Sequence, residues 1–227
     1  MSAGRCVLVS GAAAGIGAAI AERLAADGWR VHAVDLADGD LATREGNRAV
    51  VDAALERFDG RLDAVVANAG FQHVAPVRDF PEDRWDALLA VLLTSPFLLA
   101  KHAWDALTAS GDGRFLVVAS VHGLVASPFK AGYVAAKHGV MGLVKVLALE
   151  GAAAGISASA LCPAYVRTEL VERQLADRSL DDLLAPQAVK RMLEPSEVAG
   201  AAAWLLGPDG RAVTGAPLVL DLGWTAH

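Results

Sequence analysis

Cysteine is nearly absent from the sequence, since only Cys6 and Cys162 occur among its 227 residues. Two cysteines cannot form a disulfide framework, and their wide separation does not match the short spacing of metal ligands. We therefore expect no metal site, and we interpret both thiols as packing residues. Because such low cysteine usage is typical of reducing compartments, we also expect a cytoplasmic protein.

Long apolar runs and blocks of like charge are missing as well. The longest apolar stretch, residues 88–100, is shorter than the ~18 residues that a membrane span requires and contains Thr94, Ser95 and Pro96. The N-terminal residues lack the basic region, apolar stretch and cleavage site of a secretory signal. With 20 Lys and Arg against 26 Asp and Glu, the chain offers no broad positive field for nucleic acid. We expect neither a membrane nor a nucleic acid as partner.

Hydrophobic residues make up 54% of the chain, which is enough for a large core. Short β-branched runs alternate with longer Ala- and Leu-rich segments of helical period, a pattern typical of a parallel sheet covered on both faces. Strands are expected at residues 6–10, 30–35, 48–51, 62–68, 113–120, 156–162 and 217–222. No linker or repeat interrupts the alternation. The sequence predicts one α/β domain over residues 1–227, a doubly wound Rossmann-type sandwich with about seven parallel strands.

A glycine-rich turn, SGAAAGIG at residues 10–17, follows the first expected strand. Glycines let the backbone approach a pyrophosphate, and the following helix N-terminus offers free N–H groups. Asp35 ends the second expected strand, where a carboxylate binds ribose hydroxyls and repels a 2′-phosphate. The turn contains no Lys or Arg that would neutralise this phosphate. Separately, the turn fits tight packing and Asp35 fits a solvated acid, but together they predict a dinucleotide site for NAD.

Tyr133 and Lys137 stand four residues apart in YVAAK, which places both side chains on one face of a helix. Because a nearby ammonium lowers the pKa of a phenol, we expect Tyr133 to exchange a proton with a substrate oxygen. Ser120 ends an expected strand at the sheet edge where α/β proteins bind ligands, and its hydroxyl can polarise a carbonyl. Taken singly, these residues also fit a surface pair and a helix cap. Their order along the chain favours one site for hydride transfer.

The segments SGAAAGIG, ANAG at residues 67–70, Ser120, YVAAK and CPAYVRT at residues 162–168 resemble the motif series of the short-chain dehydrogenase/reductase family over essentially the whole chain. The resemblance implies an oxidoreductase with the catalytic residues Ser120, Tyr133 and Lys137. It also implies a homotetramer or homodimer, with helices at residues 85–109 and 133–150 in one interface. The cofactor-binding residues that it implies are Gly11, Ala13, Gly15, Ile16, Gly17, Asp35, Asp52, Asn68, Ala69, Gly70, Tyr133, Lys137, Pro163, Val166 and Thr168.

Other segments, FQHVAP at residues 71–76, residues 120–140, LVERQ at residues 170–174 and the terminal LGWTAH, are similar to the D-3-hydroxybutyrate dehydrogenases of that family. This likeness implies a small hydroxy or oxo acid as substrate, with Lys130 as counter-ion of its carboxylate and a small lid at about residues 168–195. The implied substrate-binding residues are Gln72, Ser120, His122, Lys130, Tyr133, Tyr165, Gln174 and Trp224. His122, Lys130 and Gln174 also fit solvent-facing loop or lid positions.

Two departures from the family leave alternatives open. The lid is short, which permits another small secondary alcohol, ketone or hydroxy acid as substrate. Leu92 stands where the family usually has an Asn that helps to hold a proton-relay water, and a leucine side chain cannot hydrogen-bond water. A catalytically weak NAD(H)-binding relative is therefore a further alternative.

Overall fold

A single sheet of six parallel strands organises the computed structural model, which describes residues 4–174 and 179–226 without the side chains of Leu170, Arg173 and Gln174. The strand order is β2-β1-β3-β4-β5-β6. From β1, the chain first forms β2 on one side and then places β3 and the later strands on the other side. Ligands of open α/β sheets bind at the carboxyl ends of the strands beside such a switch point. The strands are β1 (Cys6–Ser10), β2 (Arg30–Val34), β3 (Ala64–Ala67), β4 (Arg114–Val118), β5 (Ser157–Pro163) and β6 (Pro217–Leu220).

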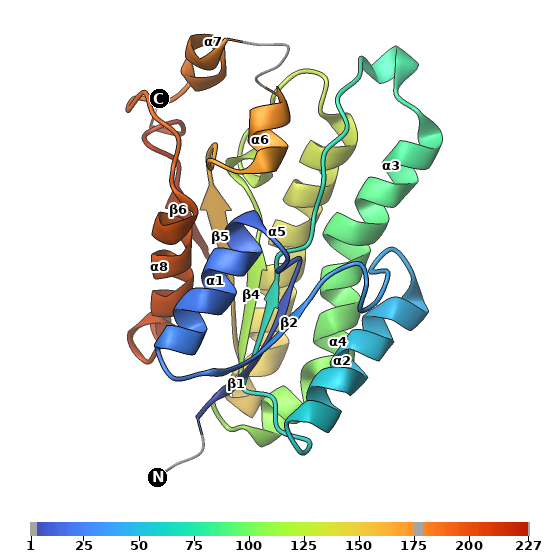
Figure 1. Cartoon of the computed structure of the whole chain (residues 1–227), viewed down its shortest axis with the longest axis vertical. Coiled ribbons are helices and arrows are strands. Elements are labelled where there is room, and N and C mark those ends of the chain that lie inside the picture. The colour runs from blue at the N-terminus through green and yellow to red at the C-terminus, as the bar shows by residue number, and fades with distance from the viewer. Residues whose placement is uncertain (1–3, 175–178, 227) are drawn as a thin grey trace.

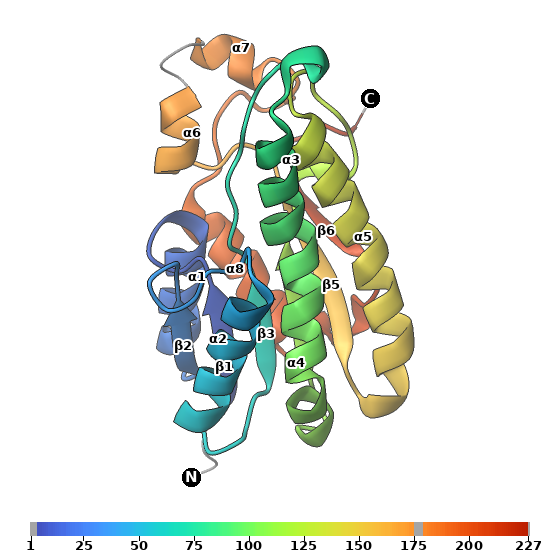
Figure 2. The same ribbon diagram turned by 90° about the vertical axis from the view of Figure 1, so that its right-hand side faces the viewer.

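Helices cover both faces of the sheet (Figures 1 and 2). One layer consists of α1 (Gly15–Ala26) and α8 (Pro195–Leu206), and the other of α2 (Arg44–Arg57), α4 (Ser95–Ala109) and α5 (Ala131–Gly151). Helix α3 (Glu82–Leu89) continues into α4 through a π-helical turn, Ala90–Thr94. The short helices α6 (Glu169–Gln174) and α7 (Leu180–Leu184) lie near the carboxyl ends of the strands (Figure 1). Single 3-10 turns occur at Val77–Asp79, Val121–Gly123, Ala152–Ala154 and Asp209–Ala212.

Alternating strand residues supply two separate cores. In β1, Val7 and Val9 pack with the α1 and α8 side chains, whereas Cys6 and Leu8 pack with those of α2, α4 and α5. Both faces of a central strand are therefore covered, which explains why the sequence of β1 is continuously apolar rather than alternating. The predicted doubly wound α/β class is confirmed.

The strand predicted at residues 48–51 does not exist, and the sheet has six strands rather than about seven. These residues lie inside α2, which begins after Thr43, whose hydroxyl accepts the Gly46 N–H at 3.0 Å. Val50, Val51 and Ala54 form a buried stripe at helical spacing. The β-branched pair is thus part of an amphipathic helix, and the chain passes from β2 to β3 through a single crossover.

Two helical segments, Glu82–Ala109 and Ala131–Ala154, are long and apolar enough to cross a membrane by length and composition. Both pack against each other and against strands of the sheet (Figure 2). Core helices of globular domains have the same properties, so length and composition alone are weak evidence for a membrane span.

Candidate functional site

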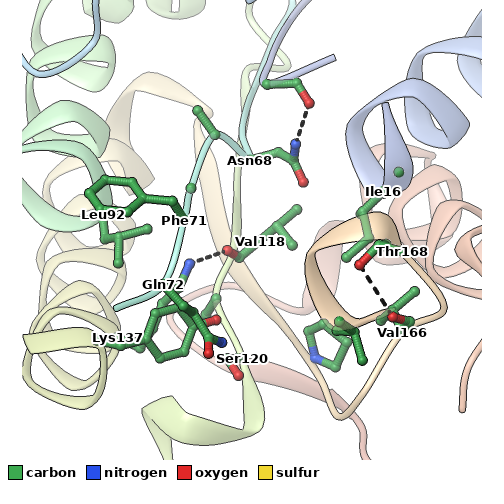
Figure 3. A pocket seen from close by; sticks show the side chains of 18 of the residues that line it. Ile16, Asn68, Phe71, Gln72, Leu92, Val118, Ser120, Lys137, Val166 and Thr168 are labelled. Atoms are coloured by element: carbon green, nitrogen blue, oxygen red, sulfur yellow. Dashed lines mark hydrogen bonds between the residues drawn. The ribbon is translucent and has the colours of Figure 1, made fainter. Parts of the chain in front are cut away.

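One cavity of about 590 Å³ lies at the carboxyl edge of the sheet. This volume is in the range of small-molecule and cofactor sites, about 300–1,000 Å³. Gln72, Ser120 and Lys137 gather on one side of it, and Ile16 and Thr168 lie on the opposite side (Figure 3). The predicted site residues that line it are Gly11, Ala13, Gly15, Ile16, Asp35, Asn68, Ala69, Gly70, Gln72, Ser120, His122, Tyr133, Lys137, Pro163, Tyr165, Val166, Thr168 and Trp224.

The glycine-rich turn leaves backbone exposed to this cavity. Gly11 has φ +65°, and a Cβ there would lie 2.6 Å from the Cα of Ala69. The Asn68 amide fixes the turn by donating to the carbonyls of Ser10 at 3.0 Å and Gly11 at 2.9 Å. Ala14, at the N-cap of α1, offers no side-chain acceptor to the first helical N–H groups. These uncapped donors fit an anionic phosphate.

Asp35 follows the last residue of β2 and is half-buried at the cavity wall. Its carboxylate accepts the N–H of Ala13 at 2.9 Å and the N–H of Leu36 at 2.8 Å. These bonds fix the carboxylate beside the glycine-rich turn and leave lone pairs for ribose hydroxyls. Among the described lining residues, Lys137 is the sole Lys or Arg. The residues present therefore fit the adenosine and pyrophosphate groups of a nicotinamide dinucleotide.

Gly17 and Asp52, both predicted to bind cofactor, do not line the cavity. Gly17 lies in α1, where a Cβ would clash with the carbonyl oxygen of Gly11 and the amide of Asn68, so it serves close packing of the turn. Asp52 lies on the exposed side of α2 and pairs with Arg48 at 3.4 Å. The residues around Asp52 form a helix instead of the predicted strand, and the adenine contact of Asp52 stays a prediction.

The sheet and α5 bring Ser120, Tyr133 and Lys137 together. Ser120 lies two residues after β4, where its backbone N–H donates to the Cys162 sulfur on β5. Tyr133 lies in the first turn of α5, and its hydroxyl is hydrogen-bonded to the side chains of Ser120 and Gln72. Lys137 follows one turn later and is 5% exposed. The predicted grouping of a hydroxyl, a phenol and an ammonium in one cavity is therefore present.

The electrostatics of this group differ from the prediction. Lys137 Nζ donates to the backbone carbonyl of Val118 at 2.8 Å and lies 5.7 Å from the centre of the Tyr133 ring. Burial lowers the pKa of Lys137 to about 8. Desolvation raises the pKa of Tyr133, and the hydrogen bonds to Ser120 and Gln72 oppose that rise. The predicted net lowering of the Tyr133 pKa is therefore wrong, because desolvation outweighs the groups that favour the phenolate, and the phenol keeps its proton at neutral pH and can donate it.

Aromatic rings form the wall next to Tyr133. The His122 ring meets the rings of Tyr133 and Trp224 edge-on, with centroids 5.9 and 5.4 Å apart, and Tyr165 packs on Trp224 at 5.4 Å. Burial lowers the pKa of His122 to about 3, and the positive charge of Lys130 adds to this effect.

Two predicted substrate-binding residues are placed differently. Lys130 is buried with Nζ 5.3 Å from the Tyr165 ring centre, and it does not itself line the cavity. Gln174 is the last residue of α6, and its side chain lies outside the described residues.

Further lining residues were not predicted to bind a ligand: Ala14, Phe71, Leu92, Val118, Ala119, Val121, Ala164, Glu169 and Val171. Val118 acts through its backbone carbonyl, which no side-chain pattern reveals. Leu92, which stands where the family usually has an Asn, lies in the π-helical turn and packs near Tyr133. Such turns occur often at functional sites, but they leave no clear sequence signal.

Comparisons with known proteins agree with this geometry. A family model described as enoyl-(acyl carrier protein) reductase matches residues 35–225. The D-beta-hydroxybutyrate dehydrogenase of Rhizobium meliloti (strain 1021) is 42% identical over 76% of this chain and 70% of its own. That of Cupriavidus necator (strain ATCC 17699) is 38% identical over 99% of both chains.

A solved structure also matches along the whole chain. It is a putative NAD(P)-dependent gluconate 5-dehydrogenase from Beutenbergia cavernae with bound NADP at low occupancy. It is 32% identical and superposes with a TM-score of 0.92 over 100% of this chain and 98% of its own. The fold, the grouped Ser120, Tyr133 and Lys137 and these relatives lead to one conclusion: the chain belongs to the short-chain dehydrogenase/reductase family and is a nicotinamide-dependent oxidoreductase.

Proposed function

We propose that the protein interconverts D-3-hydroxybutyrate and acetoacetate with NAD(H). The observation that carries this proposal is a buried cation, Lys130, behind the aromatic wall that adjoins Tyr133. A small acid whose reacting oxygen lies at Tyr133 would place its carboxylate toward that wall, where a positive charge stabilises it. The printed names of relatives at 38–42% identity support the same substrate.

The glycine-rich turn, Asn68 and the first turn of α1 would hold the pyrophosphate, and Asp35 would bind the adenosine ribose. The Asp35 carboxylate repels a 2′-phosphate, and the glycine-rich turn contributes no Lys or Arg to the described cavity lining. Both features favour NAD over NADP. Val166 and Thr168 would hold the carboxamide end, where the Thr168 hydroxyl already donates to the Val166 carbonyl at 3.4 Å. When bound, the nicotinamide accepts or supplies the hydride.

The proton is handled by Tyr133. The Tyr133 oxygen accepts hydrogen bonds from Ser120 and Gln72, so its own hydrogen is available to a substrate oxygen. During reduction, Tyr133 donates this proton to the carbonyl oxygen, and the Ser120 hydroxyl turns its hydrogen from the Tyr133 oxygen to the same substrate oxygen. During oxidation, Tyr133 first releases its own proton to solvent and then, as phenolate, accepts the proton of the substrate hydroxyl. Lys137 places its charge beside the phenol through its bond to Val118.

Spectrophotometry of NADH tests the assignment. The purified protein is mixed with NADH and acetoacetate, and separately with NAD and D-3-hydroxybutyrate. We expect turnover in both directions and a loss of at least about 100-fold in Tyr133→Phe, the usual contribution of a general acid. NADH affinity of the variant, measured by fluorescence, should equal that of the unaltered protein.

A panel of other substrates separates the alternatives. Turnover of gluconate or another hydroxy acid without turnover of D-3-hydroxybutyrate would replace the substrate assignment and keep the dehydrogenase chemistry. NADH binding without turnover of any alcohol or ketone would identify a catalytically weak relative. Unchanged activity in Tyr133→Phe would refute the assigned mechanism.

We also propose self-association through α4 and α5. Phe97 on α4 and Val146 and Leu149 on α5 are 45%, 48% and 80% exposed, which leaves apolar side chains on the outer faces of these helices. Light scattering coupled to size-exclusion chromatography would show a dimer or tetramer, and Leu149→Glu should weaken it. A monomer at micromolar concentration would contradict this proposal.

A further inference from the structure

Trp224 contributes to the cavity wall from the segment that follows β6. Its side chain lines the cavity and is 7% exposed. The ring packs against His122 and against Tyr165, with ring centroids 5.4 Å apart in both pairs. Because the His122 ring also contacts Tyr133, a substrate that extends from Tyr133 along His122 meets the indole next. The position of Trp224 therefore decides how much room the cavity has beyond His122.

A closed turn at residues 221–225 holds the backbone of Trp224. Asp221 follows the last residue of β6, and its backbone carbonyl accepts the N–H of Trp224 at 3.1 Å. One carboxylate oxygen of Asp221 accepts the N–H of Gly223 at 2.9 Å. The other carboxylate oxygen accepts both the N–H and the hydroxyl of Thr225, at 2.7 and 2.6 Å. The side chain of Asp221 therefore fixes the backbone on both sides of the indole.

Leu222 joins this turn to the segment between α7 and α8. Its φ of +54° lies in the left-handed region, which is unfavourable for a residue with a Cβ. Its carbonyl accepts the N–H groups of Ala188 and Val189, both at 3.0 Å, and its side chain packs on the core of α1 and α8. A Cβ at Gly223 would lie 2.7 Å from the Cβ of Ala188, so the two segments are in contact. Strained backbone persists where surrounding contacts determine it, and it is common at ligand sites.

We propose that Asp221 and Thr225 are positioning residues, which hold the Trp224 indole in the cavity wall and so set the length of the substrate that the enzyme accepts. Both act through the indole, since neither side chain lines the cavity itself. A loosened turn lets the indole move away from His122, which enlarges the space beyond that ring and leaves Tyr133 in place. The inference rests on the proposed reaction at Tyr133, but not on which alcohol is the substrate.

Thr225 provides a matched pair of variants. Thr225→Val removes the hydroxyl that binds Asp221 and keeps the shape of the side chain, whereas Thr225→Ser keeps the hydroxyl. Because Thr225 is exposed, neither change disturbs the core. We expect the valine variant to raise KM for the substrate about 3–10-fold, as for the loss of one hydrogen bond, with kcat within about 2-fold. The serine variant should restore KM.

A control and two outcomes make this comparison decisive. Thr108→Val makes the same change at an exposed position of α4 and should alter neither constant. An unchanged KM in Thr225→Val would show that the hydroxyl does not position the indole. A fall in kcat at constant KM would assign Thr225 to the chemical step or to the fold as a whole, and it would equally overturn the proposal.

Asp221→Asn tests the limit on substrate length. The amide keeps the size of the side chain, but its nitrogen accepts no hydrogen bond, so the N–H of Gly223 or of Thr225 loses its acceptor. The assay compares whichever alcohol of the panel is turned over with two homologues, each lengthened by one CH₂ on one side of the reacting carbon. We expect the unaltered protein to reject at least one homologue by about 10-fold or more in kcat/KM, and the variant to lower this ratio at least about 3-fold. An unchanged ratio, or equal use of all three alcohols by the unaltered protein, would refute the length limit.

Fluorine nuclear magnetic resonance of protein labelled with 5-fluorotryptophan follows the indole without any turnover. The chain has five tryptophans, and the Trp224 signal is assigned by its loss in Trp224→Phe. We expect Asp221→Asn and Thr225→Val to shift or broaden this signal and to leave the signal of Trp29, which packs under Arg5, unchanged. An unmoved Trp224 signal in both variants would overturn the inference even if the KM values change. A protein that binds NADH and turns over no alcohol would refute the proposed function, while this spectrum would still test the turn.

Discussion

The Lys137 ammonium donates to the carbonyl of Val118 at 2.8 Å, and this bond ties α5 to the carboxyl end of β4. The cation is thereby held 5.7 Å from the centre of the Tyr133 ring, close enough to act on the phenol without a direct bond to it. The position of the charge thus depends on the sheet as much as on the helix that carries both residues.

Lys137→Met tests this arrangement. The variant removes the positive charge and leaves the Val118 carbonyl without its donor, so we expect reduction to slow by about 100-fold or more. Lys145→Met makes the same change at an exposed position of α5 and should keep full activity. Steady-state kinetics with NADH give the comparison. Equal activity in the two variants would show that the ammonium has no role in the chemistry.

The pH dependence of reduction follows from the same group. Lys137 has a pKa of about 8, so its charge is present below that pH and is lost as pH rises through it. We expect kcat/KM for reduction to fall above pH 8, because Tyr133 then loses the cation beside it. The slower Lys137→Met enzyme should lack this step in its profile. A step of equal size in both proteins would assign the titration to a different group.

His122 should make the protein sensitive to acid. The pKa of His122 is about 3 in the folded protein and 6.5 for an ordinary histidine, so between these pH values the unfolded chain binds a proton that the folded chain does not. The free energy of unfolding should therefore fall with decreasing pH by up to about 1.4 kcal/mol per pH unit from this group.

Urea denaturation between pH 7 and pH 5 measures this contribution. The pH slope of the free energy of unfolding should become smaller in His122→Asn than in the unaltered protein. His102→Asn, on α4, controls for loss of a histidine as such. A slope that is the same in all three proteins would show that His122 protonates without unfolding.

Asp35 should set the choice of coenzyme. Asp35→Ser removes the charge that opposes a 2′-phosphate and retains a short hydroxyl near the N–H of Ala13. We expect the ratio of kcat/KM for NAD to that for NADP to fall by at least about 10-fold, equivalent to ~1.4 kcal/mol. Asp38→Ser, which alters a neighbouring exposed acid, is the comparison. An unaltered protein that uses NADP better than NAD would reverse the assignment.

Gly70 and Leu92 should be energetically coupled. A Cβ at Gly70 would lie 2.8 Å from Cδ2 of Leu92, which is 1% exposed and packs in the cluster that includes Tyr133. Gly70→Ala should therefore destabilise the fold by about 1–3 kcal/mol. The double variant with Leu92→Ala should lose less stability than the sum of the losses in the two single variants, by about 0.5–3 kcal/mol. Strict additivity in urea denaturation would show that Leu92 moves aside freely.

The sequence predicted the frame of the site better than its details. The glycine-rich turn, Asp35 and the YVAAK spacing act over a few residues, so their local pattern was enough to place them. Val50 and Val51 were wrongly predicted to lie in a strand, because a β-branched pair fits both a strand and the buried stripe of a helix. In the structure these residues pack in the buried stripe of α2.

Other features depend on contacts between distant segments. The pKa of Tyr133 is governed by desolvation and by Gln72 and Ser120, which lie in the segments that follow β3 and β4. The bond between Lys137 and Val118 involves a backbone carbonyl, and Ser127 meets His122 through the path of a loop. None of these contacts has a periodic signature in the sequence.

The π-helical turn at Ala90–Thr94 constrains how the gene can change. One residue in a helix corresponds to a rotation of about 100°. Since α3 packs on α5 and α4 packs on α2, inserting or deleting a single codon within Glu82–Ala109 would turn one half of the segment away from its partner. Length variation among descendants of this chain should therefore accumulate in the surface loops and spare this stretch.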